Sequence, residues 1–189
     1  MTIYSAKALL FTAFILLADI HMSLAQSNDS EPMGRAFNAG MGPGYFGGLQ
    51  LPAPYTTINY EYEVAGYTTI APFLGFASYR SAPQVIGGKN YYYRATIMPL
   101  GIKATYYLDK LLHIPCRWDV YVAGTAGYAF TTKEWDYGYP GTDDAVPGIT
   151  PHFLLLHLGA EYHVSKRTGL FADVSTGVAT FGFAIHGYN

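Results

Sequence analysis

The sequence predicts an all-β fold, an eight-stranded antiparallel up-and-down transmembrane β-barrel, and three observations support this prediction. The 189 residues include 18 Tyr, 11 Phe and 21 Gly, and charged residues make up only 13%, about half the fraction usual in soluble globular proteins. Apolar and polar residues alternate along most of the chain, as they do in strands. Both faces of these segments carry too little charge for a sheet that meets water.

The first 25 residues are expected to be a signal peptide that is cleaved after export. Lys7 precedes an apolar run over 8–18, and the small residues Ser23 and Ala25 stand at −3 and −1 of a cleavage site after Ala25. The run is shorter than the roughly 20 apolar residues that a membrane-spanning helix needs. Residues 26–34 are polar and predict a mobile periplasmic leader, which leaves 35–189 for the barrel domain.

Eight strands follow, and turn residues such as Gly, Pro, Asp and Ser separate them. In the second predicted strand, which is Tyr-rich, the even-numbered residues are apolar, whereas Glu61 and Glu63 lie on the other face. A third strand begins after the turn at 65–66. The predicted strands cover 35–46, 56–64, 67–79, 91–108, 118–134, 149–164, 168–178 and 180–188.

The later strands repeat this alternation. Between 96 and 108 the apolar residues are again even-numbered, opposite Lys103, and from 154 to 164 they lie opposite Glu161 and His163. In the last two strands, Asp173 and His186 oppose the apolar faces. Prolines at 72 and 99 lie inside strands, where each removes a hydrogen-bond donor and predicts a bulge.

Seven polar side chains are expected to point into the barrel, because they lie opposite the apolar faces of their strands. Short turns and the N-terminus lie on the periplasmic side of such barrels, which places most of these side chains in the periplasmic half. Eight strands leave an interior only wide enough for side chains, so these groups should hydrogen-bond to one another in a single network near the periplasmic end. A proton-sensitive site is the alternative interpretation. The residues are Glu61, Glu63, Lys103, Glu161, His163, Asp173 and His186.

No catalytic residue, metal site or cofactor is predicted. His152, His157 and His163 do not form a metal triad without further ligands, and no G-x-S-x-G motif supports a lipid hydrolase built on His152 or His157. The single cysteine, Cys116, excludes an intramolecular disulfide. A formal net charge of −2 gives no basic excess for binding nucleic acid.

Three segments carry a resemblance to a known family: TTINYEYEVAGYTTIAPFLGFASYR, WDVYVAGTAGYAF and FLLLHLGAEYHVSKRTGLFADV. In these segments the chain resembles the small eight-stranded outer-membrane β-barrel proteins, often labelled porin-like, of the Bacteroidetes type. The resemblance covers nearly all of 35–188. It departs from many such barrels at the C-terminus, where the aromatic residue Tyr188 stands one place before the end.

The expected function is that of a non-enzymatic protein in the outer membrane of a Gram-negative bacterium, with a structural or surface-interaction role. Its lumen should be filled by polar side chains and should form no open pore. The expected partners are outer-membrane lipid and the barrel insertion machinery, and the protein should be a monomer. Two alternatives remain open: a small barrel enzyme acting on outer-membrane lipid, and a secreted soluble barrel that binds a ligand.

Overall fold

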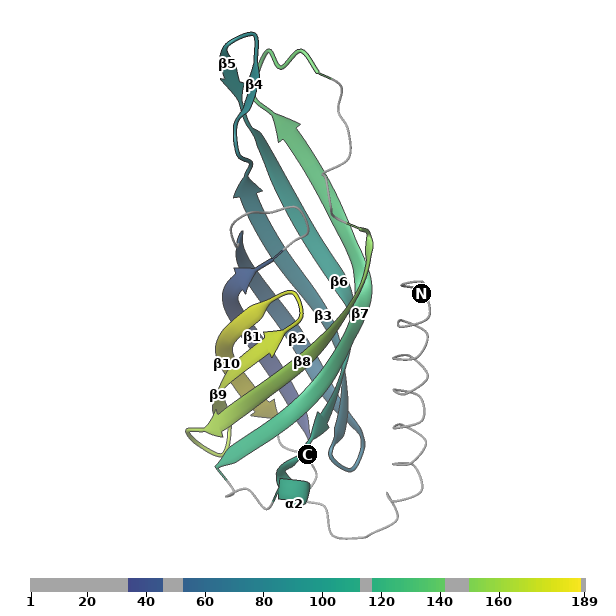
Figure 1. The fold of residues 1–189 in the computed structure, drawn as a ribbon. Coiled ribbons are helices and arrows are strands. Elements are labelled where there is room, and N and C mark those ends of the chain that lie inside the picture. Colours follow the sequence, from purple (N-terminus) through teal and green to yellow (C-terminus); the bar gives the residue numbers. More distant parts are fainter. Residues whose placement is uncertain (1–33, 46–52, 113–116, 142–149, 188–189) are drawn as a thin grey trace.

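Eight strands close into an antiparallel barrel, which confirms the predicted fold class (Figure 1). The computed structural model describes residues 34–45, 53–112, 117–141 and 150–187; the expected signal peptide and nearly all of the expected leader lie outside them. Around the barrel the strand order is β1-β10-β9-β8-β7-β6-β3-β2. The barrel strands are β1 (Arg35–Gly44), β2 (Ala53–Ala65), β3 (Thr68–Arg80), β6 (Tyr93–Tyr107), β7 (Trp118–Trp135), β8 (His152–His163), β9 (Thr168–Ser175) and β10 (Ala179–Gly187).

Pairing between the first and last strands closes the sheet. Arg35 lies opposite Gly187 and Met41 opposite Phe181, while the other side of β1 pairs with β2 along its whole length. Each barrel strand therefore has two hydrogen-bonded neighbours. Closure removes the exposed strand edges that an open sheet would present.

The two ends of the barrel differ. At one end, called the turn end here, lie the short connections 66–67 and 164–167 and the short helix α2 (Asp109–Leu112). The opposite end is called the loop end. There β3, β6 and β7 extend well beyond the other strands, and the hairpin of β4 (Gln84–Ile86) and β5 (Lys89–Tyr91) forms the tip (Figure 1). This extension is called the projection, and it comprises residues 78–94 and 131–139.

The hairpin at the tip was not expected from the sequence, which placed a connection there. Its turn is the pair Gly87-Gly88, with φ angles of 59° and 77°. Two consecutive residues with positive φ are what a type I′ turn requires, and this turn matches the twist of the two strands it joins. The residues Ile86 and Lys89 pair directly across it. Helix α2 was likewise not expected in the connection between β6 and β7.

The predicted bulges at the two prolines are wrong. The pairing of β3 with β6 keeps one register on both sides of Pro72 and Pro99. Instead, each proline interrupts the ladder with one neighbour: β2 and β3 resume their pairing at Tyr62 and Ile70. The missing N–H groups therefore remove hydrogen bonds without inserting a residue. The register shift between β2 and β3 lies at Glu63 and Ala65, beside the turn.

Large apolar side chains cover the outside of the barrel. In β8 the exposed fractions are 52% for Leu154, 46% for Leu156 and 60% for Leu158. The even-numbered residues of this strand thus point outward, as the alternation predicted. Within the described residues, no helix is long and apolar enough to cross a membrane.

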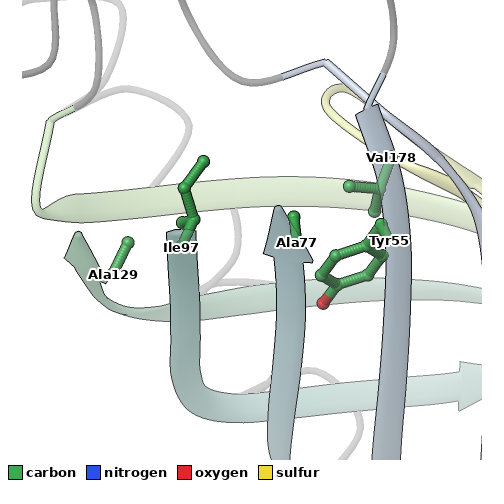
Figure 2. Packing of buried hydrophobic residues seen from close by; sticks show 5 residues of the cluster. All are labelled: Tyr55, Ala77, Ile97, Ala129 and Val178. Atoms are coloured by element: carbon green, nitrogen blue, oxygen red, sulfur yellow. The ribbon is translucent and has the colours of Figure 1, made fainter. Parts of the chain in front are cut away.

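The interior near the loop end is apolar. Tyr55, Ala77, Ile97, Ala129 and Val178 form a buried cluster contributed by five different segments (Figure 2). The sequence predicts a lumen filled by polar side chains, with the charged ones near the periplasmic end. The alternation does not single out this cluster, because isolated apolar residues such as Ile97 and Ala129 do not stand out on the inward face of a strand.

Candidate functional site

Polar side chains fill the interior near the turn end, and hydrogen bonds join them in three groups. Each group centres on one buried carboxylate, Asp173, Glu61 or Glu161, with an exposed fraction of 3 to 4%. A buried carboxylate is costly unless its oxygens accept hydrogen bonds. Each carboxylate has at least one partner on another strand more than 20 residues away in the sequence.

Asp173 on β9 is held by the most partners. Lys103 Nζ lies 2.9 Å from Asp173 Oδ2, and the Tyr121 hydroxyl donates to the same oxygen at 3.1 Å. His157 Nδ1 lies 2.6 Å from Asp173 Oδ1, and Thr125 Oγ1 lies 2.8 Å from His157 Nε2. These contacts link β6, β7, β8 and β9 across the interior.

Glu61 on β2 accepts three hydrogen bonds, all at 2.9 Å. Asn38 Nδ2 donates to Oε1, while Thr69 Oγ1 and the Tyr107 hydroxyl donate to Oε2. These donors are neutral groups on β1, β3 and β6. The ring of Tyr107 also lies 5.6 Å from that of Tyr121, with the two planes tilted by 59°, so this group contacts the Asp173 group through a pair of tyrosines.

Glu161 on β8 lies between two histidines. His186 Nε2 is 2.6 Å from Glu161 Oε1, and His163 Nδ1 is 3.9 Å from the same oxygen. The other ring nitrogen of His163, Nε2, lies 2.6 Å from Asp119 Oδ2. The group therefore runs from β10 through β8 to the first residues of β7.

Asp109 lies beside this last group, in α2 just outside the strands. Its Oδ1 accepts a hydrogen bond from the backbone N–H of Val120 at 2.8 Å, which ties α2 to β7. Burial raises the pKa of the Asp109 carboxyl, and the nearby charge of Asp119 raises it further. The turn end therefore carries several carboxylates close together.

Six of the seven residues expected in the lumen belong to these groups. Glu63 lies apart from them at the turn end, where its Oε2 accepts a hydrogen bond from the N–H of Gly34 at 3.1 Å. Sequence reasoning did not include several participants, although they share the inward parity of their strands. Those residues are Asn38, Thr69, Tyr107, Asp119, Tyr121, Thr125 and His157.

Thr125, His157 and Asp173 stand in the order hydroxyl, imidazole, carboxylate, which is the order of a hydrolase triad. Two features oppose a catalytic role. Asp173 is also bound by Lys103 and Tyr121, so its charge is already matched. The segments of β7 and β8 around Thr125 are paired in the sheet, which leaves no obvious pair of backbone donors there for an oxyanion. The hydrogen bonds of the three residues join β7, β8 and β9 through their side chains.

A cavity of about 180 Å³ separates the apolar cluster from the Asp173 group. Apolar side chains such as Phe73, Ile97 and Phe153 line most of it, and Lys103 and His157 supply part of its polar wall. Tyr107 and Tyr121, both buried, pack together on the turn-end side. The side chains of the Asp173 group that line the cavity are Lys103, Thr125, His157 and Asp173.

The projection carries a cluster of aromatic and cationic side chains. The rings of Trp135 and Tyr139 stack with centroids 3.7 Å apart, and Tyr93 meets Trp135 edge to face at 5.0 Å. Lys133 Nζ lies within 4.8 Å of the Tyr93 and Trp135 ring centroids. Arg80 pairs with Asp136 at 3.4 Å. Rigid aromatic side chains and arginine are the types that most often dominate binding at protein surfaces.

Comparisons with known proteins find the fold but no family. No protein-family model matches the chain, and no curated protein matches it. A designed transmembrane β-barrel is 13% identical with a TM-score of 0.50, covering 83% of this chain and 98% of the designed one. Neisserial surface protein A is 14% identical with a TM-score of 0.50, covering 81% of this chain and 96% of its own.

A third similar structure is the attachment invasion locus protein of Yersinia pestis, solved in complex with the heparin analogue sucrose octasulfate. It is 9% identical with a TM-score of 0.47 and covers 80% of this chain and 95% of its own. At such low identities, the likenesses to the designed barrel and to Neisserial surface protein A support the eight-stranded closed antiparallel barrel and nothing finer.

Replacing Lys103 by Met should destabilise the barrel by about 3–5 kcal/mol, because it leaves the buried Asp173 without its cation. The double variant Lys103→Met/Asp173→Asn should recover much of this loss, since it removes both charges. Urea unfolding of protein refolded in detergent micelles measures both changes. Lys166→Met, at an exposed turn position, is the control and should stay within about 0.5 kcal/mol of the parent. Purely additive effects in the double variant would show that the two residues are not coupled.

Proposed function

We propose that this chain is a non-enzymatic outer-membrane barrel of a Gram-negative bacterium that has no open pore and displays a structured projection at the cell surface. The observation that carries this proposal is the apolar outer surface of a closed barrel. Outward side chains from all eight barrel strands contribute to it. Examples, one per strand, are Phe37, Ile58, Leu74, Leu100, Val122, Leu156, Leu170 and Phe183.

A surface of this kind is unsuited to water. Soluble monomers rarely expose a contiguous apolar patch of more than a few hundred Å², whereas lipid-facing strands alternate apolar outward residues with polar inward ones. A closed barrel also leaves no strand edge unpaired, as the hydrocarbon layer requires. These arguments favour a membrane barrel over the secreted soluble barrel that the sequence left open.

The orientation follows from the connections. Bacterial outer-membrane barrels have short periplasmic turns and longer extracellular loops. The turn end, with connections 66–67 and 164–167, would then face the periplasm, and the projection would face the outside of the cell. Export by a signal peptide cleaved after Ala25, and handling by the barrel insertion machinery, belong to the same proposal.

A surface role is favoured over catalysis for two reasons. The polar groups of the interior bond one another, and the triad-like Thr125, His157 and Asp173 lie beside paired strands without an evident oxyanion site. In contrast, the projection holds Trp135 and Tyr139 in fixed stacking at the surface.

We further propose a monomer. We also propose that the chain is related to the small outer-membrane barrels of the Bacteroidetes type. The support for this relation is the pattern of residue types in the three segments quoted above.

Leu156→Arg should impair membrane insertion and cost about 2–4 kcal/mol, because it places a charge on the lipid face near the middle of β8. Heat-modifiable electrophoretic migration and urea unfolding in lipid vesicles measure the effect. Val85→Arg, at an exposed site of the projection, is the matched control and should insert like the parent. Normal insertion of Leu156→Arg would show that this face does not meet lipid.

Planar-bilayer recordings of the folded protein should show no stable conductance. The apolar cluster around Ile97 and the tyrosine pair Tyr107 and Tyr121 bury side chains in the interior, and the interior of an eight-stranded barrel is only wide enough to be filled by side chains. Steady channels that pass small solutes would contradict the closed lumen.

Cysteine labelling of intact cells tests the orientation and the surface display directly. In a Cys116→Ser background, Lys89→Cys places a thiol on β5 of the projection, and Lys166→Cys places one at an exposed turn-end position. A membrane-impermeant maleimide should label the first variant in intact cells and the second only after the outer membrane is permeabilised. The reverse pattern would overturn the proposed orientation, and labelling of neither variant in permeabilised cells would exclude the envelope location.

A further inference from the structure

The Glu161 group contains three side chains whose chemistry and spacing suit a metal ion. One oxygen of Glu161 and one ring nitrogen each of His163 and His186 all lie within 4.8 Å of one another. We propose that these three residues bind a divalent transition-metal ion of the zinc type at the turn end of the barrel. This role goes beyond the proposed membrane function and does not depend on it.

The ligand set is one that zinc uses. Two imidazole nitrogens and one carboxylate oxygen bind zinc in sites that keep a fourth position open for water or another ligand. Bond lengths of about 2.0–2.1 Å in a tetrahedral site put neighbouring ligand atoms roughly 3.3 Å apart. Here His186 Nε2 and His163 Nδ1 lie 2.6 and 3.9 Å from Glu161 Oε1. Small side-chain rotations on a fixed backbone therefore suffice to form the site.

The orientation of the His163 ring independently supports a metal site. A histidine that binds a metal usually donates its other ring N–H to a carboxylate or carbonyl, which fixes its tautomer and its direction. His163 Nε2 lies 2.6 Å from Asp119 Oδ2, and this leaves Nδ1, the nitrogen nearer Glu161, free to act as a ligand. Asp119 would thus be a positioning residue for the site.

The strand between the two histidines leaves room for the carboxylate. Glu161 and His163 lie on β8 and His186 lies on β10, so β9 runs between them. At the crossing point β9 carries Gly169, which pairs with His163 on one side and Ala184 on the other. A Cβ atom at Gly169 would collide with Glu161 Oε1. The glycine therefore allows Glu161 to reach His186 across the intervening strand.

Charge and access also favour a cation. Glu161 and Asp119 bring two carboxylates to a site whose histidines bind metal in their neutral form, so a divalent ion would balance the local charge. The side chains of His163 and His186 are 23% and 19% exposed, whereas that of Glu161 is 6% exposed. An ion could thus enter from the turn end and meet a buried carboxylate.

Calorimetric titration of Zn²⁺ into the refolded full-length barrel, purified without a histidine tag and stripped with EDTA, tests the proposal. The parent should bind one ion per chain reversibly, and Zn²⁺ should raise its thermal unfolding midpoint. His163→Asn and His186→Gln should each weaken binding at least tenfold, and Asp119→Asn should weaken it by about 10–100-fold through the loss of orientation. Co²⁺ should give the visible absorption of a tetrahedral site in the parent.

The matched control is His152→Gln, whose side chain lies on β8 but packs against Tyr128 near the loop end. This variant should bind Zn²⁺ as the parent does. Heat-modifiable migration shows whether each variant has folded, so that loss of binding is read only from folded protein. Absence of saturable binding in the parent would overturn the proposal, and so would unchanged affinity in folded His163→Asn and His186→Gln.

Discussion

Pairing between β1 and β10 closes the sheet, and this closure determines how much room the interior side chains have. An eight-stranded barrel is just wide enough to be filled by side chains. Any charged group that points inward must therefore find its partners on the opposite or neighbouring wall. Glu61 and Asp173 meet this requirement with hydrogen-bond partners from three strands each, Glu161 meets it with His186 on β10, and the loop-end half meets it by being apolar.

The polar groups together involve every strand of the barrel. Asn38, Thr69 and Tyr107 bring β1, β3 and β6 to Glu61 on β2. Asp173 on β9 adds β7 and β8, and His186 on β10 reaches Glu161. Backbone pairing alone connects each strand only to its two neighbours. The side-chain contacts add connections through the middle of the barrel, and they concentrate at the turn end.

Alternation alone predicted the strands and the direction of most side chains, as the outward leucines of β8 and the inward Glu61 show. It could not predict which inward residues meet, because that depends on the register and tilt of strands distant in sequence. Lys103 and Asp173 are 70 residues apart. The histidines at 152, 157 and 163, which the sequence suggested considering together, lie beside Tyr128, Asp173 and Asp119 respectively. The pair Gly87-Gly88 is typical of a hairpin turn, but the composition of the surrounding segment indicated only a connection.

The closing pair of strands also has a consequence for how the chain reaches its native state. Residues 35–41 pair with residues 181–187, so the barrel closes only when the first strand pairs with the last. Folds dominated by such distant contacts fold slowly, because the entropy of closing a long loop is lost before the contacts form. Until then the strand edges stay unpaired and prone to aggregation. A chain with this topology therefore needs protection from aggregation until its first and last strands have paired.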